Sequence, residues 1–378
     1  MPADRMKNIP FSGIREIFEE CDRLEAAGKD IVHLEIGRPD FDTPEPIKAA
    51  AKEALDQSAV HYTSNYGIRP LRDALADKLS SDNGLQYDPA SEIVVTSGAT
   101  EAVFCTLVAL TGPGDEVLIP DPGWTYRPAI ETAGATPVSY PVSPDIEAIA
   151  KQVSPDTEIL VVNTPHNPTG GMIDEAHARA IRDVVVDHDL MVLSDEIYEK
   201  ICYGRDHVSL GALDGLYERT ITVNGFSKAY SMTGWRLGYL AAPESLVNPI
   251  IRLRQYTTTC APSISQHAGV RALEGSLHEP MVDAFERRRD IVTKRIESIP
   301  GMHCPTPEGA FYAFPTVPDG VTNETEFAYS LLREAGVALV PGTVFGDTGA
   351  GRFRIAYSNS TAQIKTAFDR IENWLAEQ

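Results

Sequence analysis

The sequence predicts an α/β protein with a large domain, in which a mostly parallel seven-stranded sheet lies between helices, and a smaller α+β domain formed by both chain ends. The chain has 378 residues, of which 43% are hydrophobic and 23% charged, as in globular proteins with more than one domain. Between residues 92 and 242, short apolar runs alternate with helical patterns, which is typical of βαβ units. After residue 289, short β-like runs alternate with helices in a second, smaller unit.

The seven apolar runs are the expected strands of the large sheet. Each ends at a turn or motif residue, and ligands of open parallel sheets bind at the carboxyl ends of the strands. Amphipathic patterns predict helices between the strands, for example over residues 99–110 and 175–187. The expected strands are Glu92–Thr96, Glu116–Ile119, Thr136–Tyr140, Ile159–Asn163, Leu190–Ser194, Thr220–Asn224 and Gly238–Ala241.

The smaller domain is expected to combine the C-terminal part with the start of the chain. Helical patterns cover residues 326–334 and 361–377, and the segment up to Pro44 is too short to fold alone. We therefore divide the chain into an N-terminal arm belonging to the small domain (1–44), a large domain (45–285) and a small C-terminal domain (286–378). The expected strands of the C-terminal part are Ala310–Phe314, Val337–Val340 and Phe353–Tyr357.

The negative net charge of the chain disfavours some classes of binding partner. The sequence has 33 basic and 54 acidic residues, a net charge of −21, which would repel phosphate backbones and anionic lipids. We therefore expect neither nucleic acid nor membrane partners, and small-molecule chemistry is favoured. The five cysteines are scattered without a C-x-x-C motif, which argues against disulfides and a zinc site. With no sustained apolar run near the start, a cytoplasmic location is expected.

Two strand ends carry residues suited to a charged ligand. Ser97–Glu101 joins a strand to a helix, so free N–H groups and the helix dipole favour an anion such as phosphate, although a Ser-Gly turn is also a common N-cap. Asp195 follows an apolar run, and a buried ionised carboxylate needs a cationic or hydrogen-bonded partner. A protonated heterocyclic nitrogen would serve. Capping of the next helix is the alternative role for Asp195.

Two further segments add an amide and two cations. Asn163–Gly170 contains two prolines, which predict a rigid loop presenting the Asn167 amide, whereas His166 is expected to be a solvent-facing or capping imidazole. Lys228 closes a strand, and a desolvated lysine can form a Schiff base with an aldehyde. Arg236 follows eight residues later and offers a fork suited to phosphate. Taken singly, either cation could be a surface charge.

Together these segments resemble the fold type I pyridoxal-phosphate (PLP) enzymes, in particular the class I/II aminotransferases of the aspartate aminotransferase family. The resemblance covers nearly the whole chain, and several independent motifs occur in the family's order. The matching segments are Leu34–Pro44, Tyr62–Gly67, Ser97–Val103, Pro120–Trp124, Asn163–Gly170, Asp195–Tyr198, Ser227–Arg236, Glu308–Phe314, Val340–Phe345 and Arg352–Tyr357.

The resemblance assigns the catalytic centre. It implies that Lys228 forms the Schiff base with pyridoxal 5′-phosphate and later moves the proton between substrate and cofactor. It also implies that Asp195 pairs with the pyridinium nitrogen, and that Asn167 and Tyr198 hydrogen-bond the ring oxygen. Trp124 matches the aromatic residue that stacks on the ring.

The resemblance also implies a phosphate site and a shared dimer. In the family, a tyrosine matching Tyr62 reaches the phosphate from the neighbouring subunit, so we expect a homodimer with shared active sites. The phosphate is expected to be held by Gly98, Ala99, Thr100 and Arg236, with Ser227 as a helper.

Two residues are expected to hold the substrate. Arg354 matches the arginine that binds the α-carboxylate bidentately, with Arg352 as the less favoured candidate, and Gly37 matches a backbone contact to the same group. Thr100 stands where some aspartate-specific relatives have lysine, and Arg38 stands where many have glutamate or glutamine. The resemblance therefore does not identify the amino donor.

The function expected from these residues is PLP-dependent transfer of an amino group between an L-amino acid and a 2-oxo acid by a ping-pong mechanism. The same residues would also support β-elimination at a C–S bond, γ-elimination or oxygen-dependent oxidation. A silent ligand-sensing module is disfavoured because no helix-turn-helix segment precedes Leu34. A metal hydrolase is disfavoured because no HExxH motif or clustered His/Asp set is present, so no metal is expected.

Overall fold

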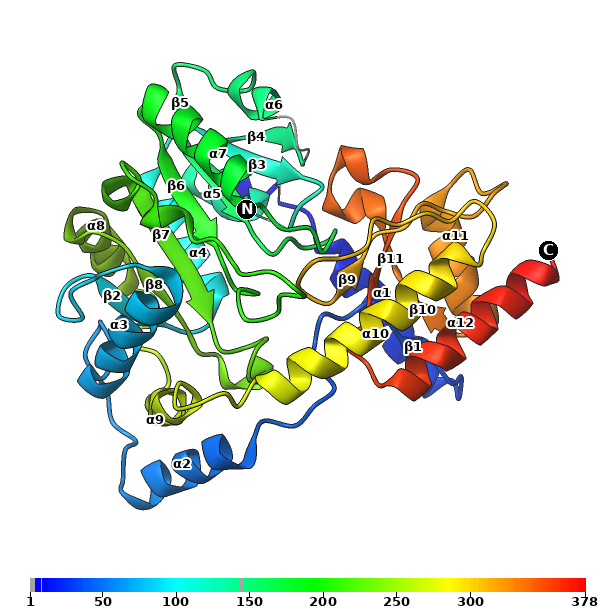
Figure 1. Ribbon diagram of the computed structural model, residues 1–378, viewed down its shortest axis with the longest axis horizontal. Coiled ribbons are helices and arrows are strands. Elements are labelled where there is room, and N and C mark those ends of the chain that lie inside the picture. Colours follow the sequence, from blue (N-terminus) through cyan, green and yellow to red (C-terminus); the bar gives the residue numbers. More distant parts are fainter. Residues whose placement is uncertain (1–3, 8, 125, 143–145) are drawn as a thin grey trace.

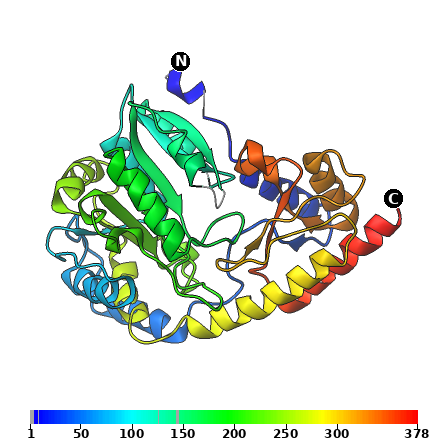
Figure 2. The ribbon, with the colours of Figure 1, turned by 45° about the horizontal axis from the view of Figure 1, so that its top comes forward.

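The computed structural model describes residues 4–7, 9–124, 126–142 and 146–378, and it confirms the predicted fold class. A large part built around a twisted sheet lies beside a smaller part that contains the C-terminus (Figure 1). The first described residues, Asp4–Lys7, instead lie beside α5 (Arg127–Ala133) of the large part. Figure 2 shows the same division, with the long helix α10 (Glu279–Glu297) running along one side of the smaller part. Short 3-10 turns, among them Asp4–Lys7, Leu210–Ala212 and Tyr217–Arg219, connect the main elements.

The large sheet has seven strands among the described residues, in the order β2-β8-β7-β6-β5-β3-β4. All neighbouring strands are parallel except that β8 runs antiparallel to both β2 and β7. Each strand coincides with an expected one to within a few residues. The strands are β2 (Ile93–Thr96), β3 (Glu116–Asp121), β4 (Thr136–Pro141), β5 (Thr157–Asn163), β6 (Met191–Asp195), β7 (Thr220–Gly225) and β8 (Gly238–Ala241).

Both faces of this sheet are buried, which explains why its strands are continuous apolar runs. On one face, Ile159 and Val161 of β5 pack with α4 (Ala99–Leu110), α5 (Arg127–Ala133) and α8 (Glu244–Arg254). On the other face, the alternate residues Leu160 and Val162 pack with α6 (Glu147–Ala150) and α7 (Glu175–Asp187). Near β2 and β8, a third cluster involves α2 (Glu45–Asp56), α3 (Arg69–Asn83) and α9 (Ser263–Ala272).

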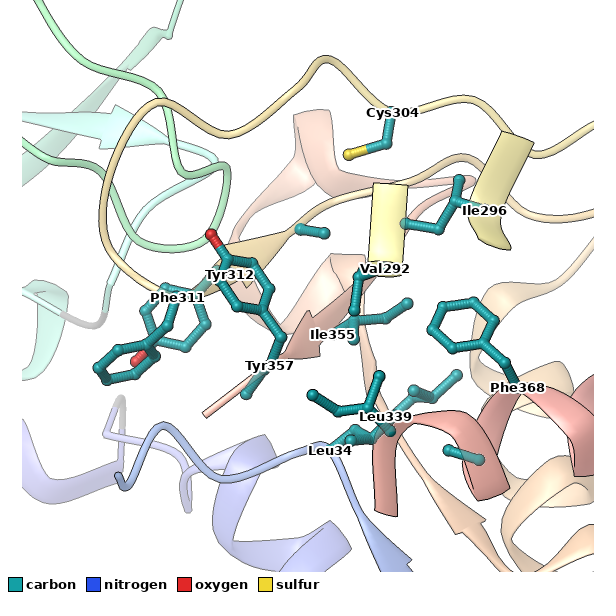
Figure 3. Packing of buried hydrophobic residues seen from close by; sticks show 14 of the residues in the cluster. Leu34, Val292, Ile296, Cys304, Phe311, Tyr312, Leu339, Ile355, Tyr357 and Phe368 are labelled. Carbon is teal, nitrogen blue, oxygen red and sulfur yellow. The ribbon is translucent and has the colours of Figure 1, made fainter. Parts of the chain in front are cut away.

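The smaller part contains two short sheets. Strand β1 (Val32–His33) pairs in parallel with β10 (Val337–Ala338), so the segment that contains β1 joins the C-terminal part. Strands β11 (Val340–Pro341), β12 (Phe353–Ala356) and β9 (Tyr312–Ala313) form an antiparallel sheet. Leu34, Val292, Ile355 and Phe368 belong to the core between these strands, α10 and α12 (Thr361–Ala376) (Figure 3).

Local interactions explain where this part differs from the expected elements. The single run expected over Val337–Val340 is two strands, because β10 pairs with β1 whereas β11 pairs with β12. The helix expected from residue 326 begins earlier, as α11 (Glu324–Ser330), because the side chain of Asn323 caps it by accepting bonds from two backbone amides. It continues as one π-helical turn, Leu331–Ala335.

Helix α10 lies across the expected domain boundary at residues 285 and 286 without a break. Met281 and Phe285 in its first half and Val292 in its second half belong to one hydrophobic cluster with the smaller sheets. Both halves of the helix therefore pack in the core that contains the smaller sheets. No helix in the described part of the chain is both long and apolar enough to cross a membrane.

Candidate active site

A cavity of about 250 Å³ lies where the carboxyl ends of β5, β6 and β7 face the smaller part. This is the edge at which ligands of open α/β sheets bind. Its lining includes eleven of the thirteen predicted site residues: Gly37, Ala99, Thr100, Trp124, Asn167, Asp195, Tyr198, Ser227, Lys228, Arg236 and Arg354. Residues as far apart in the chain as 37 and 354 therefore meet in one cavity.

Asp195, the last residue of β6, is a buried carboxylate with a neutral partner. Its Oδ2 accepts a hydrogen bond of 2.8 Å from the hydroxyl of Tyr126, and its Oδ1 accepts one of 3.3 Å from the backbone amide of Ile197. Burial raises the pKa of Asp195 to about 6, and these two hydrogen bonds act in the opposite direction. No cation of the described residues forms an ion pair with it, so the carboxylate is suited to a cationic ligand.

Lys228 follows β7 and lies deep in the cavity. Its Nζ donates a hydrogen bond of 2.7 Å to the backbone oxygen of Gly37. Burial, followed by the charges of Arg354 and Arg236, lowers its pKa to about 8, while Asp195 partly offsets this effect. A lysine with a lowered pKa has a larger neutral fraction near neutral pH, which a nucleophile or a base requires.

The start of α4 and Arg236 form a site suited to an anion. Helix α4 begins at Ala99 without a side-chain cap, so its first amides have no partner within the helix. Gly98 has a φ of +82°, and a Cβ at this position would lie 2.5 Å from an Nη atom of Arg236. Only glycine allows the guanidinium to lie so close to the helix start. Arg236 donates to the backbone oxygens of Thr233 and Ser97, at 3.0 and 3.5 Å, and pairs with no carboxylate among the described residues.

Arg354 of β12 is a buried cation held by neutral groups. One Nη donates to Oδ1 of Asn167 at 3.0 Å, the other donates to the backbone oxygen of Glu35, and Nε has no partner among the described residues. The guanidinium carbon lies 4.6 Å from the ring centroid of Tyr312 and 4.8 Å from that of Phe345. Because no carboxylate of the described residues neutralises this buried charge, the site is suited to an anionic substrate group.

Aromatic side chains complete the cavity. The hydroxyl groups of Tyr198 and Tyr312 lie 2.8 Å apart and share a hydrogen bond. A Cβ on Gly37 would lie 1.9 Å from the Tyr312 hydroxyl, so this position requires glycine. Trp124 is half-buried and meets Tyr126 edge to face, with the ring centroids 5.5 Å apart.

Two predicted site residues do not line the cavity, and one further residue is more buried than predicted. Gly98 does not line the cavity itself but adjoins Arg236. Tyr62 is 89% exposed and is not part of the cavity lining. His166 is buried, so a solvent-facing imidazole was a wrong expectation: its Nδ1 shares a hydrogen bond of 2.8 Å with Thr169 in the same rigid loop. Burial lowers the pKa of His166 to about 4.

Sequence reasoning missed three polar residues of the site. Asn163 braces the loop, since its Oδ1 accepts from the amide of Asn167 and its Nδ2 donates to the backbone oxygen of Asp195. Tyr126 and Tyr312, described above, hold Asp195 and Tyr198. Asn163 and Tyr312 lie inside matched motifs, which is a usable signal. Tyr126 lies two residues beyond the matched motif Pro120–Trp124, and only its hydrogen bond to Asp195 shows that it belongs to the site.

The comparisons with known proteins agree with this arrangement. A model of the family "Aminotransferase class I and II" matches residues 29–371. An aromatic-amino-acid aminotransferase of Thermococcus litoralis is 41% identical over all of this chain and 98% of its own. An aspartate aminotransferase of Pyrococcus abyssi is also 41% identical, with the same coverage.

Solved structures give the same result. The aromatic aminotransferase of Pyrococcus horikoshii superposes with a TM-score of 0.90 at 42% identity, covering 94% of this chain and 98% of that one. The aspartate aminotransferase of Thermus thermophilus with maleate superposes with a TM-score of 0.94 at 35% identity, covering 99% of both chains. These matches favour amino transfer over the elimination, oxidation and sensing alternatives. The chain therefore belongs to the class I and II aminotransferase family, whose members are PLP-dependent transaminases.

Proposed function

We propose that this cavity binds pyridoxal 5′-phosphate and exchanges an amino group between an L-amino acid and a 2-oxo acid, with Lys228 as the residue that carries the cofactor. The observation that carries the proposal is the convergence of Lys228, Asp195 and Arg354 on one cavity. When bound, the cofactor supplies an aldehyde carbon for the amino group and a cationic ring that withdraws electrons from the substrate Cα.

The donor set fits this group. The uncapped start of α4 and the unpaired guanidinium of Arg236 suit its phosphate, for which Ala99, Thr100 and Ser227 line the same wall. The buried carboxylate of Asp195 suits a protonated ring nitrogen, because that cation would supply the charged partner that the described residues do not. Trp124, Asn167 and Tyr198 would contact the ring from the cavity lining.

Lys228 and Arg354 have different roles toward the substrate: the first transfers a proton and the second binds the carboxylate. With its pKa near 8, the Nζ of Lys228 can take a proton from the substrate Cα and return it during each half-reaction. Arg354 can bind the α-carboxylate through its guanidinium fork, with Gly37 beside it, which fixes the orientation of the Cα–H bond. A ping-pong sequence follows, because donor and acceptor use the same carboxylate site in turn.

The proposal extends to the assembly and its surroundings. The exposed Tyr62 is a candidate to complete the phosphate site of a neighbouring subunit, so we expect a homodimer with shared active sites. The scattered free cysteines favour a reducing, cytoplasmic location. Because relatives include aspartate and aromatic aminotransferases, acidic and aromatic amino acids are the first donors to test.

A half-reaction panel tests the proposal. Purified holoenzyme is mixed with one amino acid at a time, and the absorbance of the cofactor is followed with and without oxygen. A productive donor should bleach the visible band, and a 2-oxo acid should restore it. Borohydride reduction followed by peptide mapping should place the label on Lys228. Bleaching without oxo-acid recovery, or a label on another residue, would contradict the proposal.

A further inference from the structure

A second cluster of reactive side chains lies outside the cavity, between α1 (Gly13–Ala26) and the segment that contains β1. It consists of a thiol, an imidazole and a carboxylate: Cys21, His33 and Glu35. One ligand atom from each residue lies within 4.8 Å of those from the other two. In Figure 1 the two segments lie together in the smaller part, so the cluster joins the start of the chain to this part.

One buried atom of this cluster has no hydrogen-bond partner among the described residues. Glu35 is completely buried, and although its Oε1 lies 2.7 Å from Nδ1 of His33, its Oε2 has no hydrogen-bond partner. Cys21 is also completely buried and packs against apolar neighbours such as Ile17 and Leu332. A buried carboxylate oxygen without a partner is costly, and a bound cation would remove that cost.

A similar cluster elsewhere in the chain shows what a satisfied arrangement looks like. Glu196, Glu199 and His207 also lie within 4.8 Å of one another. There the ammonium of Lys78 pairs with Glu199, and the hydroxyl of Ser209 donates to Glu196 at 2.6 Å. This second cluster contains a lysine cation and needs no metal, whereas among the described residues the only cation that pairs with Glu35 is His33, itself a member of the first cluster.

We propose that Cys21, His33 and Glu35 bind a zinc ion. The ligand atoms would be Sγ of Cys21, Nδ1 of His33 and the unpartnered Oε2 of Glu35, a mixture of thiolate, imidazole and carboxylate that suits Zn²⁺. His33 is partly exposed, so water can take the fourth position. Tetrahedral zinc bonds of about 2.0–2.3 Å place the ligand atoms roughly 3.3–3.8 Å apart, so atoms separated by up to 4.8 Å must approach by about 1–1.5 Å.

The outer contacts of His33 support this assignment. Its Nε2 lies 3.1 Å from Oε1 of Glu25, so the ring can donate to a carboxylate on the side away from the metal. A carboxylate bonded to the distal nitrogen of a ligating histidine is a recurrent outer contact of zinc sites. Without metal, Cys21 and Glu35 raise the pKa of His33 to about 11, and zinc would displace that proton together with the thiol proton.

The proposed zinc would stabilise one wall of the active-site cavity. Ile14 of α1 and Ile36, which follows Glu35, both line that cavity. The backbone oxygen of Glu35 accepts a hydrogen bond from Arg354, the proposed substrate-binding residue. A metal that joins α1 to Glu35 would therefore fix the position of the segment whose backbone oxygen accepts the hydrogen bond from Arg354. The spacing of the three ligands, unlike a C-x-x-C pair, gives no recognisable zinc motif in the sequence.

Metal content and a cobalt spectrum test the proposal on tag-free holoenzyme dialysed against zinc and then against buffer. We expect about one zinc per chain, and in the cobalt-substituted protein tetrahedral visible bands with a thiolate-to-cobalt charge-transfer band. Cys21→Ser should lose the charge-transfer band and most of the zinc. Cys304→Ser is the matched control, because Cys304 is also buried in the smaller part but belongs to no such cluster among the described residues.

Two carboxylate variants separate inner from outer contacts. Glu35→Gln should abolish zinc retention, whereas Glu25→Gln should weaken zinc affinity by about 10- to 100-fold. Wild-type protein that retains no zinc, or that binds cobalt without a thiolate band, would overturn the proposal and leave the cluster as an ion pair. The wild-type spectrum decides the question even if a variant fails to fold.

Discussion

The two walls of the active-site cavity are built in different ways. The wall formed by the large sheet takes Asp195 from the last position of β6, and Asn167 and Lys228 from the segments that follow the adjacent strands β5 and β7, so its residues lie in short local motifs. The opposite wall takes Gly37 and Arg354 from the smaller part, at opposite ends of the chain. A short motif can therefore specify the first wall, whereas the second exists only after long-range pairing.

The contacts across the cavity join these walls. Lys228 donates to the backbone of Gly37, 191 residues away in the chain, and Arg354 donates to Asn167, 187 residues away. We infer that the sheet wall serves the cofactor and the chemical step, whereas the other wall serves substrate binding. Substitutions should then separate into effects on kcat and cofactor retention and effects on KM.

The largest effect is expected for Lys228→Ala on the sheet wall. Loss of the amine removes both the covalent attachment and the proton carrier, so kcat should fall by about 10²- to 10⁴-fold or more. Single-turnover kinetics with the reconstituted variant measure this loss, and cofactor fluorescence measures non-covalent binding. Normal turnover would remove Lys228 from the mechanism.

The next effect is expected for Asp195→Asn, also on the sheet wall. An amide cannot supply the negative charge that holds a protonated ring nitrogen, so kcat should fall by about 10²- to 10³-fold and the cofactor should dissociate more readily. Steady-state rates and the cofactor dissociation constant check this expectation. Asn163→Ala is a useful comparison, since it disturbs the backbone of the same strand end without removing the charge. Unaltered kinetics in Asp195→Asn would contradict the pairing.

Arg354→Ala tests the opposite wall. Loss of its charge-assisted hydrogen bonds, worth about 1.5–3 kcal/mol, should raise the KM for amino acids by about 10- to 100-fold while the cofactor remains bound. Arg352→Ala is the matched control, because Arg352 donates to the backbone of Phe314 and does not line the cavity. If both variants bind amino acids as the wild type does, another group holds the carboxylate.

Tyr126→Phe should have a smaller effect on the sheet wall. Removing the hydroxyl that donates to Asp195 raises the pKa of this carboxyl further above about 6, so more of it is protonated at neutral pH. Cofactor affinity should fall by about tenfold, a loss of roughly 1.4 kcal/mol, and the deficit should grow as the pH falls from 8 to 6. Equilibrium titration of the apoenzyme at several pH values measures it; a deficit independent of pH would indicate a packing effect.

The smallest expected effect is a shift in the pH dependence of cofactor incorporation. This shift involves both walls, because residues of both walls lower the pKa of Lys228. Arg354 and Arg236, after burial, lower the pKa of Lys228 from 10.5 to about 8. The neutral amine attacks the cofactor aldehyde, so the rate of cofactor incorporation into apoenzyme should rise with pH through a midpoint near 8. Arg354→Ala should move this midpoint upward. A midpoint near 10.5 in the wild type would mean that the lysine is not desolvated.

The sequence pattern predicted which segments form helices and strands better than it predicted which segments pack against one another. The helices over residues 99–110 and 175–187 occur as expected, because their patterns are local. The run over Val337–Val340 has one hydrophobic pattern, yet it forms strands of two different sheets. Its first half pairs with β1, and its end pairs with β12. His166 was expected to be a solvent-facing or capping imidazole; the packing of its loop buries it, and its ring contacts Thr169 of the same loop.

The sequence by itself determined the fold class, the family and the identity of most residues that line the cavity, because apolar runs and motif residues at strand ends are local properties of the chain. Only the tertiary structure decided that Tyr126 supports Asp195, that Tyr312 contacts Tyr198, and that Cys21 lies beside Glu35. These contacts join segments that are distant in the chain or carry no motif, and packing alone fixes which of them meet.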